Sequence, residues 1–245
     1  MSTTATKIAL VTEANKGIGF EVAREIGRTG ATILVGARDE KAGQEAVVKL
    51  TAEGIHAQFI RIDLTDRAAI QAAAQSVDDQ FGRLDILVNN AGIFLGKDDG
   101  PPSAISIATM ETTFRTNFFG AVAVTQAMLP LLRKATSARI VNVSSGLGSL
   151  TLNGDPNHPY SKAKSLGYNA SKAALNMLTV QLADELRDTP IKVNSADPGY
   201  TATDLNGHSG PQTIPEGAVE VVQLALLPDS GPTGTFSNKK GTVPW

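Results

Sequence analysis

The most informative absence in this chain of 245 residues is cysteine, which does not occur at all. Disulfide frameworks, thiolate metal sites and cysteine nucleophiles are therefore excluded. Charged residues are also scarce, at 19%, and the formal net charge is only −2. This low charged fraction argues against a disordered or coiled-coil protein. Without basic runs, the chain also lacks the electrostatic footprint of a nucleic-acid-binding protein.

Long hydrophobic runs are absent as well. The first apolar stretch, 8–11, is too short for the hydrophobic region of a signal peptide, and no run of about eighteen apolar residues exists to span a bilayer. The three histidines, His56, His158 and His208, do not have the spacing of metal ligands, so we expect no metal site. These absences favour a soluble cytoplasmic protein without a membrane or nucleic-acid partner.

What the sequence does contain is an alternation of apolar runs with amphipathic stretches. Strands are predicted at 7–12, 31–36, 57–62, 84–88, 139–143 and 191–195, and helices at 20–29, 39–52, 66–81, 103–134 with breaks, 167–188 and 215–227. Strands that are apolar without interruption, separated by helices, predict a parallel sheet buried between two layers of helices. We therefore expect residues 1–245 to form a single-domain, doubly wound α/β fold of the Rossmann type. The segment at about 147–166 is rich in Gly, Ser, Asn and Pro and is predicted to be an inserted loop.

The first predicted strand is followed by a turn that contains glycine. Ligands of doubly wound sheets bind outside the carboxyl ends of the strands, so the residues after each strand carry the most functional information. Gly17 and Gly19 would let the backbone approach a pyrophosphate, whose charge the next helix N-terminus favours. An ordinary tight turn is the alternative. On the first interpretation the cofactor-binding residues here are Asn15, Lys16, Gly17, Ile18 and Gly19.

The second predicted strand is followed by a cation. Arg38 lies 19 residues after Gly19, near the position where an acidic residue would hold the ribose 2′-hydroxyl of NAD. A guanidinium there can pair with a 2′-phosphate, and Lys16 offers a second positive charge. This pattern predicts NADP(H) in preference to NAD(H). The alternative leaves both side chains as ordinary surface cations.

The segments after the third and fourth strands complete the predicted nucleotide site. Asp63 and Leu64 are expected near the adenine. Asn90, Ala91 and Gly92 follow the fourth strand and permit close approach to a ligand. Both segments also suit a plain loop or cap.

A tyrosine and a lysine stand four positions apart at two places in the sequence. Tyr168 and Lys172 share one face of a predicted helix, and Tyr160 and Lys164 have the same spacing eight residues earlier. Tyr168 begins a long periodic helix, whereas Tyr160 follows the turn-like segment 157–159. We therefore favour the pair formed by Tyr168 and Lys172.

Six segments in order resemble the short-chain dehydrogenase/reductase family over nearly the whole chain. They are the glycine turn, Asn89-Asn-Ala-Gly92, Asn117-Phe-Phe-Gly120, Val143-Ser-Ser145, Tyr168-Asn-Ala-Ser-Lys172 and Pro198-Gly199. Within that family, the long segment before Tyr168 and the closing Pro244-Trp245 resemble carbonyl-reductase-like members.

The resemblance implies roles for particular residues. The catalytic group would be Asn117, Ser145, Tyr168 and Lys172, with Ser145 rather than Ser144 as the family serine, although a serine at a strand end is most often a cap or turn residue. Residues on the nicotinamide side of the cofactor would be Tyr168, Lys172, Pro198, Gly199, Thr201 and Thr203.

The chemistry of carbonyl reduction suits these roles. Hydride transfer leaves an alkoxide that needs a proton, which Tyr168 can supply. A free phenol has a pKa of about 10, and the Lys172 ammonium is expected to lower the pKa of Tyr168. Ser145 can hydrogen-bond the substrate oxygen. Asn117 is expected to hold a water that relays protons past Lys172, or else to be a helix-kink residue. The expected pocket wall is Ser145, Leu147, Tyr200 and Leu205.

Together these residues predict an NADPH-dependent enzyme that reduces the carbonyl of a ketone or aldehyde, reversibly, with an apolar small molecule as its substrate. Two alternatives remain open. One is a narrower hydroxysteroid or 3-oxoacyl reductase, and the other is a sensor or scaffold that binds NADP(H) without turnover.

Two departures from the family pattern generate further expectations. Glu13 stands where glycine is usual, so we expect weaker cofactor affinity than in a Glu13→Gly variant, with strain if its φ is positive. Ser145 and Tyr168 are 23 positions apart, a longer spacing than usual. We expect the inserted residues to favour a monomer or dimer over a tetramer, a state that light scattering measures.

Overall fold

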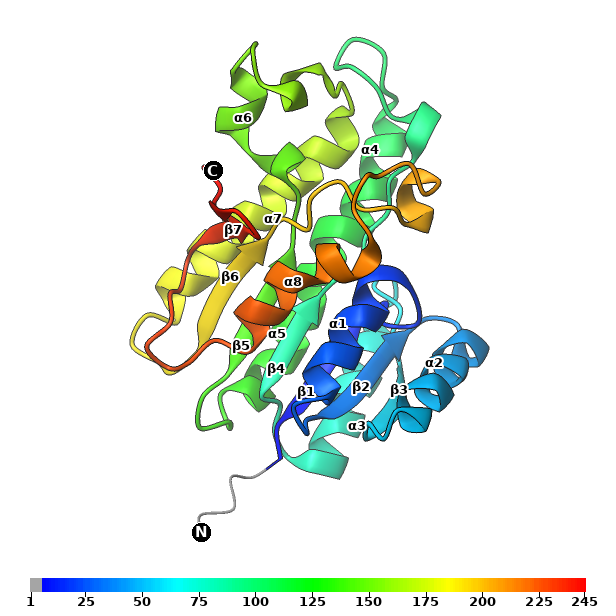
Figure 1. The fold of residues 1–245 in the computed structure, drawn as a ribbon, viewed down its shortest axis with the longest axis vertical. Helices are drawn as coiled ribbons and strands as arrows, with labels where there is room; N and C mark the ends of the chain where they lie inside the picture. Colours follow the sequence, from blue (N-terminus) through cyan, green and yellow to red (C-terminus); the bar gives the residue numbers. More distant parts are fainter. Residues whose placement is uncertain (1–5) are drawn as a thin grey trace.

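The computed structural model describes residues 6–245, which are organised around one sheet of eight strands (Figure 1). Neighbouring strands are parallel up to β7, and the last pair, β7 and β8, is antiparallel. The doubly wound fold is therefore confirmed, with an antiparallel edge that the sequence did not reveal. The strands are β1 (Ile8–Thr12), β2 (Thr32–Ala37), β3 (Ala57–Arg61), β4 (Ile86–Asn89), β5 (Arg139–Val143), β6 (Lys192–Ala196), β7 (Phe236–Asn238) and β8 (Gly241–Thr242).

The strand order places a crevice between β1 and β4. The order across the sheet is β3-β2-β1-β4-β5-β6-β7-β8, so the chain builds outward from β1 and then restarts on its other side. Val11 is opposite Val88 in the register, so the two strands end beside each other. A reversal of this kind separates the loops that follow the two strands and creates the usual ligand site of the fold.

Helices cover both faces of the sheet, and alternate residues of β1 pack into the cores on its two sides. Ile8 and Leu10 of β1 pack on the side of α3 (Arg67–Phe81), α5 (Ala121–Leu132) and α7 (Leu166–Glu185). Ala9 and Val11 pack on the side of α1 (Gly17–Gly27), α2 (Glu40–Ala52) and α8 (Ile214–Ala225). Burial on both faces explains why the strand sequences are apolar without alternation.

Acidic side chains fix where two helices begin. The Asp39 carboxylate accepts a hydrogen bond from the N–H of Ala42 at the start of α2. The Asp66 carboxylate accepts from the N–H groups of Ala68 and Ala69 at the start of α3, as the sequence predicted. Caps of this kind contribute about 1 kcal/mol each.

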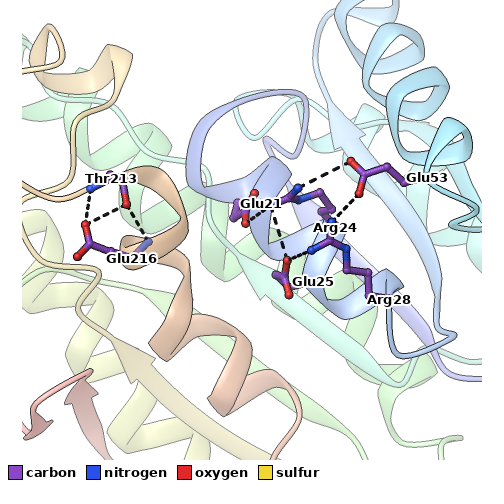
Figure 2. Close-up of polar contacts among 7 residues, drawn as sticks. All are labelled: Glu21, Arg24, Glu25, Arg28, Glu53, Thr213 and Glu216. Carbon is purple, nitrogen blue, oxygen red and sulfur yellow. Dashed lines mark hydrogen bonds and ion pairs between the residues drawn. The ribbon is translucent and has the colours of Figure 1, made fainter.

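Helices α1 and α8 lie side by side, and polar contacts hold their ends (Figure 2). At the start of α8, the Thr213 N–H donates to the Glu216 carboxylate (2.8 Å) while the Thr213 hydroxyl accepts from the Glu216 N–H (3.4 Å). On α1, Arg28 pairs with Glu25 (2.7 Å) and with Glu53 beyond the end of α2 (2.8 Å). These ion pairs are partly exposed, so each contributes less than about 1 kcal/mol.

A ladder of buried polar side chains crosses the sheet from β4 to β6. The Asn89 amide donates to the Thr125 hydroxyl (2.9 Å) and to Asn142 Oδ1 (2.8 Å). The Asn142 amide donates to the Thr179 hydroxyl, which also hydrogen-bonds the Ser195 hydroxyl, both at 2.8 Å. Because buried polar groups are costly without partners, the ladder fixes how α5 and α7 sit on three strands.

The segment 146–166 is not the plain loop that the sequence predicted. It contains a 3-10 turn at Gly146–Gly148, the short helix α6 (Leu150–Gly154) and a second 3-10 turn at Pro159–Lys162. The Thr151 N–H and hydroxyl both donate to the carbonyl of Trp245, at 3.0 and 2.7 Å. The Trp245 ring in turn stacks on Phe236 of β7, so the segment is fastened to the edge of the sheet.

No helix among the described residues is long and apolar enough to cross a bilayer.

The polar ladder predicts a stability effect at Asn142. An Asn142→Ala substitution removes one of the hydrogen-bond partners of the buried Asn89 amide and one of those of the Thr179 hydroxyl, so we expect the free energy of unfolding to fall by roughly 2–4 kcal/mol. Urea unfolding measures this change. The exposed Asn157→Ala is the matched control and should shift stability by no more than about 0.5 kcal/mol. Equal effects of the two substitutions would contradict the structural role of the ladder.

Candidate active site

The crevice between β1 and β4 opens into a cavity of about 370 Å³. Its wall is formed by the turns after β1, β4, β5 and β6 together with one face of α7. The wall residues are Glu13, Lys16, Gly17, Ile18, Gly19, Asn90, Gly92, Ile93, Phe94, Leu95, Val143, Ser144, Tyr168, Lys172, Pro198, Thr203, Asp204 and Leu205.

The predicted site residues divide into two groups by this wall. The structure brings together Lys16, Gly17, Ile18, Gly19, Asn90, Gly92, Tyr168, Lys172, Pro198, Thr203 and Leu205. The residues outside the wall are Asn15, Arg38, Asp63, Leu64, Ala91, Asn117, Ser145, Leu147, Gly199, Tyr200 and Thr201. Several of the second group still act on the cavity through the residues that line it.

The glycine turn is built for close backbone approach. Gly17 has a φ of +58°, which is the left-handed region, and α1 begins at this residue rather than at the predicted position 20. A Cβ on Gly19 would lie 2.5 Å from the Glu13 carbonyl and 2.4 Å from the Asn90 amide nitrogen. Gly19 is thus required for the close packing of this turn, and the first residues of α1 lie in the cavity wall, where a helix N-terminus suits an anionic group.

Thr12 fastens the turn after β4 to the glycine turn. Its hydroxyl accepts hydrogen bonds from the N–H groups of Asn90 (2.9 Å) and Ala91 (3.0 Å). The Asn90 amide returns a hydrogen bond to the Thr12 carbonyl (2.9 Å). Asn90 and Ala91 therefore hold the two lips of the crevice at a fixed separation. The sequence carries no signal for this role of Thr12, because the residue is simply the last one of a strand.

Asn117 lies in a π-helical segment, Arg115–Gly120, between α4 (Ile107–Phe114) and α5. Its Oδ1 accepts from the N–H of Ile93 (2.8 Å), and its Nδ2 donates to the Ile93 carbonyl (2.9 Å) and the Ser171 hydroxyl (3.0 Å). Both amide hydrogens are used by the protein, so only oxygen atoms of Asn117 remain to hold a water. The structure shows that Asn117 lies at a kink in the helix, which points its amide at Ile93, and the water-holding role stays a prediction.

The Tyr168 and Lys172 side chains lie together on the cavity side of α7. The Lys172 ammonium donates to the Val143 carbonyl at the end of β5 (2.8 Å) and lies 5.7 Å from the centre of the Tyr168 ring. Burial lowers the pKa of Lys172 to about 8, although the Glu13 carboxylate acts in the opposite direction. The Phe94 ring packs edge-on against Tyr168 with the ring centres 5.5 Å apart.

The pKa of Tyr168 differs from the sequence expectation. Burial raises it to about 12, a hydrogen bond with Ser145 lowers it, and the nearby Asp197 carboxylate raises it. The Lys172 ammonium was expected to lower this pKa, but it does not offset the loss of solvation. Without a bound ligand, the phenol is therefore protonated at neutral pH, so it can donate a proton but cannot accept one.

Asp99 caps the helix that carries Tyr168. Its carboxylate accepts hydrogen bonds from the N–H groups of Gly167 (2.9 Å) and Tyr168 (2.8 Å), while the Gly100 carbonyl accepts from Leu166 (2.9 Å). A Cβ on Gly167 would lie only 3.2 Å from the Asp99 carboxylate. Because 69 positions separate Asp99 from Tyr168, no local sequence signal reveals this cap.

The alternative pair is not brought together with this cavity. Tyr160 lies in a 3-10 turn, its ring packs against Gly146, and it lines a separate recess with Asp197 and Tyr200. Lys164 follows that turn, is exposed and lies outside any helix. The spacing of four positions therefore has no helical meaning there.

Of the two serines and the residues expected in the pocket wall, only some line the cavity. The Ser144 hydroxyl lies 3.4 Å from the Lys172 carbonyl, and the Ser145 hydroxyl accepts from the Leu147 N–H (3.2 Å) in addition to its contact with Tyr168. Leu205 lines the cavity beside the apolar residues Ile93, Phe94 and Leu95. Leu147 and Tyr200 line two other recesses, so they do not contribute to the same wall.

The cations expected around a nucleotide have different surroundings. Arg38 follows β2 and is exposed. Lys16 instead forms an ion pair with Asp204 (2.8 Å), which also contacts His208 (3.0 Å). The second positive charge that the sequence offers at Lys16 is therefore balanced by a carboxylate in this structure, and its role toward a nucleotide stays a prediction. The pairing was not visible in the sequence, because 188 positions separate Lys16 from Asp204.

Asp63 and Leu64 serve first as local supports. Burial acts to raise the pKa of Asp63, but hydrogen bonds from Thr65 and the nearby Arg38 outweigh it and lower that pKa. Leu64 packs against Gly120, where an added Cβ would lie 2.6 Å from the leucine Cβ.

The turn after β6 is rigid at its base. Gly199 has a φ of +72°, and its N–H donates to the buried Asp197 carboxylate (3.0 Å). The Thr201 hydroxyl donates to the Pro198 carbonyl (3.1 Å), and the Thr203 N–H donates to Asn206 Oδ1 (3.2 Å). Gly199 and Thr201 therefore support Pro198 and Thr203, which face the cavity.

No group of three or more potential metal ligands of the His, Cys, Asp and Glu types gathers within the described residues.

Comparisons with known proteins identify relatives over nearly the whole chain. The family model described as short chain dehydrogenase matches residues 7–213. The (+)-neomenthol dehydrogenase of Capsicum annuum is 33% identical over 97% of this chain and 97% of its own length. Carbonyl reductase (NADPH) 1 of Mus musculus is 34% identical over 97% and 98%, respectively. The NADPH-bound carbonyl reductase from chicken fatty liver superposes with a TM-score of 0.85 at 30% identity, covering 99% of this chain and all of that one.

The Asp99 cap predicts a stability effect. An Asp99→Ala substitution leaves two N–H groups of α7 without their acceptor, so we expect the free energy of unfolding to fall by about 1–2 kcal/mol. Asp99→Asn keeps one acceptor oxygen and should lose less. The adjacent, exposed Asp98→Ala is the control in urea unfolding and should be nearly neutral. A similar loss for Asp98→Ala and Asp99→Ala would show that the cap is not what stabilises the helix.

Proposed function

Because the chain belongs to the short-chain dehydrogenase/reductase family, we propose that it is an NADPH-dependent carbonyl reductase that converts ketones or aldehydes to alcohols, reversibly. The observation that carries the proposal is the position of Tyr168 and Lys172 in the wall of the glycine-turn cavity, with Ser145 in contact with the phenol. A proton donor, its cationic neighbour and a second hydroxyl thus lie where a dinucleotide would end.

The cavity offers a cradle for a dinucleotide. Gly17 and Gly19 leave the N-terminus of α1 open to a pyrophosphate, and Gly92 leaves room beside Lys172, whose ammonium would lie 3.3 Å from a Cβ at that position. Lys172, Pro198 and Thr203 would hold the nicotinamide half. When bound, the reduced nicotinamide supplies the hydride.

Tyr168 is assigned the proton transfer. Its phenol stays protonated across the neutral range because burial raises its pKa to about 12, so it can donate to the oxygen of a carbonyl as negative charge develops there. We assign to the Ser145 hydroxyl, which hydrogen-bonds the phenol, a second hydrogen bond to the same oxygen. Lys172 holds its charge next to the ring and stabilises the phenolate that remains after the proton has left.

Arg38 supports a preference for NADP(H). It directly follows β2, where an acid would favour the ribose of NAD, and its charge lies near Asp63 and Glu13. Relatives with 2′-phosphorylated cofactors in their names or structures, including the chicken enzyme, agree with this assignment. The residues Ile93, Phe94, Leu95 and Leu205 make this end of the cavity apolar, so we expect an apolar substrate.

A binding protein without turnover is the second candidate. The observation that favours it is Glu13, a carboxylate inside the crevice where a phosphate would lie nearby. The combination of Tyr168, Lys172 and Ser145 favours the enzyme, because a binding protein has no use for a proton donor at this place.

The proposed function predicts opposite outcomes for the two tyrosines. Tyr168→Phe removes the proton donor, so we expect the rate of NADPH consumption with carbonyl substrates to fall at least 100-fold. Tyr160→Phe should retain most of the activity. Initial rates are measured with NADPH and NADH over a panel of ketones and aldehydes, with folding checked by circular dichroism. Undiminished activity in Tyr168→Phe, or no turnover of any carbonyl by the unmodified protein, would overturn the proposal.

The position of Lys172 predicts the pH dependence of reduction. Its ammonium stabilises the phenolate, and burial lowers its pKa to about 8. We therefore expect kcat for carbonyl reduction to be level below pH 8 and to fall as the pH rises through that value and Lys172 loses its charge. In Lys172→Met the rate should be low and independent of pH in this range. A wild-type profile that stays flat up to pH 10 would rule out this role.

A further inference from the structure

Glu13 has a backbone conformation that its side chain disfavours. Its φ is +53°, and His208 is the only other non-glycine residue with a positive φ among residues 6–245. A glycine would adopt this conformation without strain. Strained residues of this kind concentrate at functional sites, which makes the side chain of Glu13 a candidate for a functional role.

The Glu13 carboxylate lies inside the cofactor crevice. It lines the cavity and accepts a hydrogen bond from the N–H of Gly92 (3.3 Å) on the opposite lip. Three cations act on it from three elements: Lys16 from its own turn, Arg38 from the end of β2 and Lys172 from α7.

The charge balance around Glu13 is incomplete. Lys16 is already paired with Asp204 from the turn after β6, and Lys172 is fixed on the Val143 carbonyl. Burial raises the pKa of the Glu13 carboxyl, and the hydrogen bond from Gly92 and the three cations reduce this effect without cancelling it. The site therefore stabilises the ionised form of Glu13 less well than water does.

A bound dinucleotide would bring a second set of anions to the same cations. Two like charges in one poorly solvated cavity oppose each other, and a carboxyl group relieves this repulsion by binding a proton. We propose that Glu13 is an internal anion of the cofactor crevice, and that the binding of a phosphorylated dinucleotide is coupled to uptake of a proton by its carboxyl group. This inference rests on the proposed function only in assuming that a dinucleotide binds here.

The coupling fixes the sign of the pH dependence. The phosphates favour the neutral carboxyl, so the carboxyl pKa is higher in the complex than in the free protein. Between these two pKa values the dissociation constant of the dinucleotide rises with pH by up to tenfold per pH unit. Above both values Glu13 stays charged and the affinity remains low.

The experiment measures protons rather than turnover. NADPH is titrated calorimetrically into the protein in phosphate and in Tris buffer at several pH values between 5 and 8. The dependence of the binding enthalpy on the ionisation enthalpy of the buffer gives the number of protons taken up. Glu13→Gln is the matched variant, since it keeps the shape and the backbone strain but does not titrate. Protonation of the NADPH phosphates contributes to both proteins and cancels in the difference. The values between pH 5 and 7 decide the test, because Lys172, with a pKa of about 8, keeps its proton there.

We expect the wild type to take up more protons than Glu13→Gln, with a difference that reaches a large fraction of one proton. Glu13→Gln should bind NADPH about tenfold more tightly at pH 8, with a flatter pH dependence. Glu13→Gly should bind at least as tightly, because it also relieves the positive φ. Equal proton uptake and equal pH dependence in the wild type and Glu13→Gln would overturn the proposal.

A second variant separates proton coupling from a general effect of charge. Asp204→Asn removes the other carboxylate on Lys16, but Asp204 is exposed and Lys16 lowers its pKa, so it stays ionised. It should therefore change the affinity for NADPH and leave the proton uptake as in the wild type. Loss of uptake in Asp204→Asn would contradict the assignment to Glu13. If NADPH binds none of these proteins, the proposed function fails together with this inference, whereas tight binding without excess uptake overturns the inference alone.

Discussion

The hydrogen bond from the Lys172 ammonium to the Val143 carbonyl organises this molecule. It joins helix α7 to the end of strand β5, and thereby brings Tyr168 of the helix next to Ser145, which follows that strand. The same bond keeps a buried cation at the base of the crevice, where burial lowers its pKa and the Glu13 carboxylate opposes that change. The contact between Tyr168 and Ser145 depends on the position of this ammonium. The electrostatic surroundings of Glu13 depend on it as well.

A single segment after β4 connects the parts of the site that strand order alone would leave apart. Asn117 grips Ile93, Phe94 packs on the Tyr168 ring, and Asp99 caps the helix that carries this tyrosine. The π-helical turn at Arg115–Gly120 has a clear purpose in this scheme, because a regular helix would present a different side chain to Ile93. Hydrogen bonds between side chains and backbone, together with one ring contact, thus join the crevice wall to the N-terminus of α7.

The sequence predicted the sheet and the Tyr168 helix because both follow from periodicity. Unbroken apolar runs mark strands buried on two faces, and the long helical repeat distinguishes Tyr168 from Tyr160. Four features were not predictable from local pattern. Helix α6 is only five residues long and leaves no periodic signal, the Asp99 cap and the Lys16–Asp204 pair join distant positions, and the raised pKa of Tyr168 depends on burial that only the folded chain creates.

The ion pair between Lys16 and Asp204 has a consequence for how the crevice is entered. It connects the glycine turn to the turn after β6, both residues line the cavity, and each side chain is about half exposed, at 52% and 58%. The pair thus connects these two turns on the exposed side of the cavity, where a dinucleotide that entered would meet it. Dissolved salt weakens partly exposed ion pairs, so it would weaken the pair between Lys16 and Asp204. The same salt also screens the attraction between cations of the site and phosphates. Ionic strength would then act on the association rate of a dinucleotide in two opposite directions, by freeing Lys16 and by screening its charge.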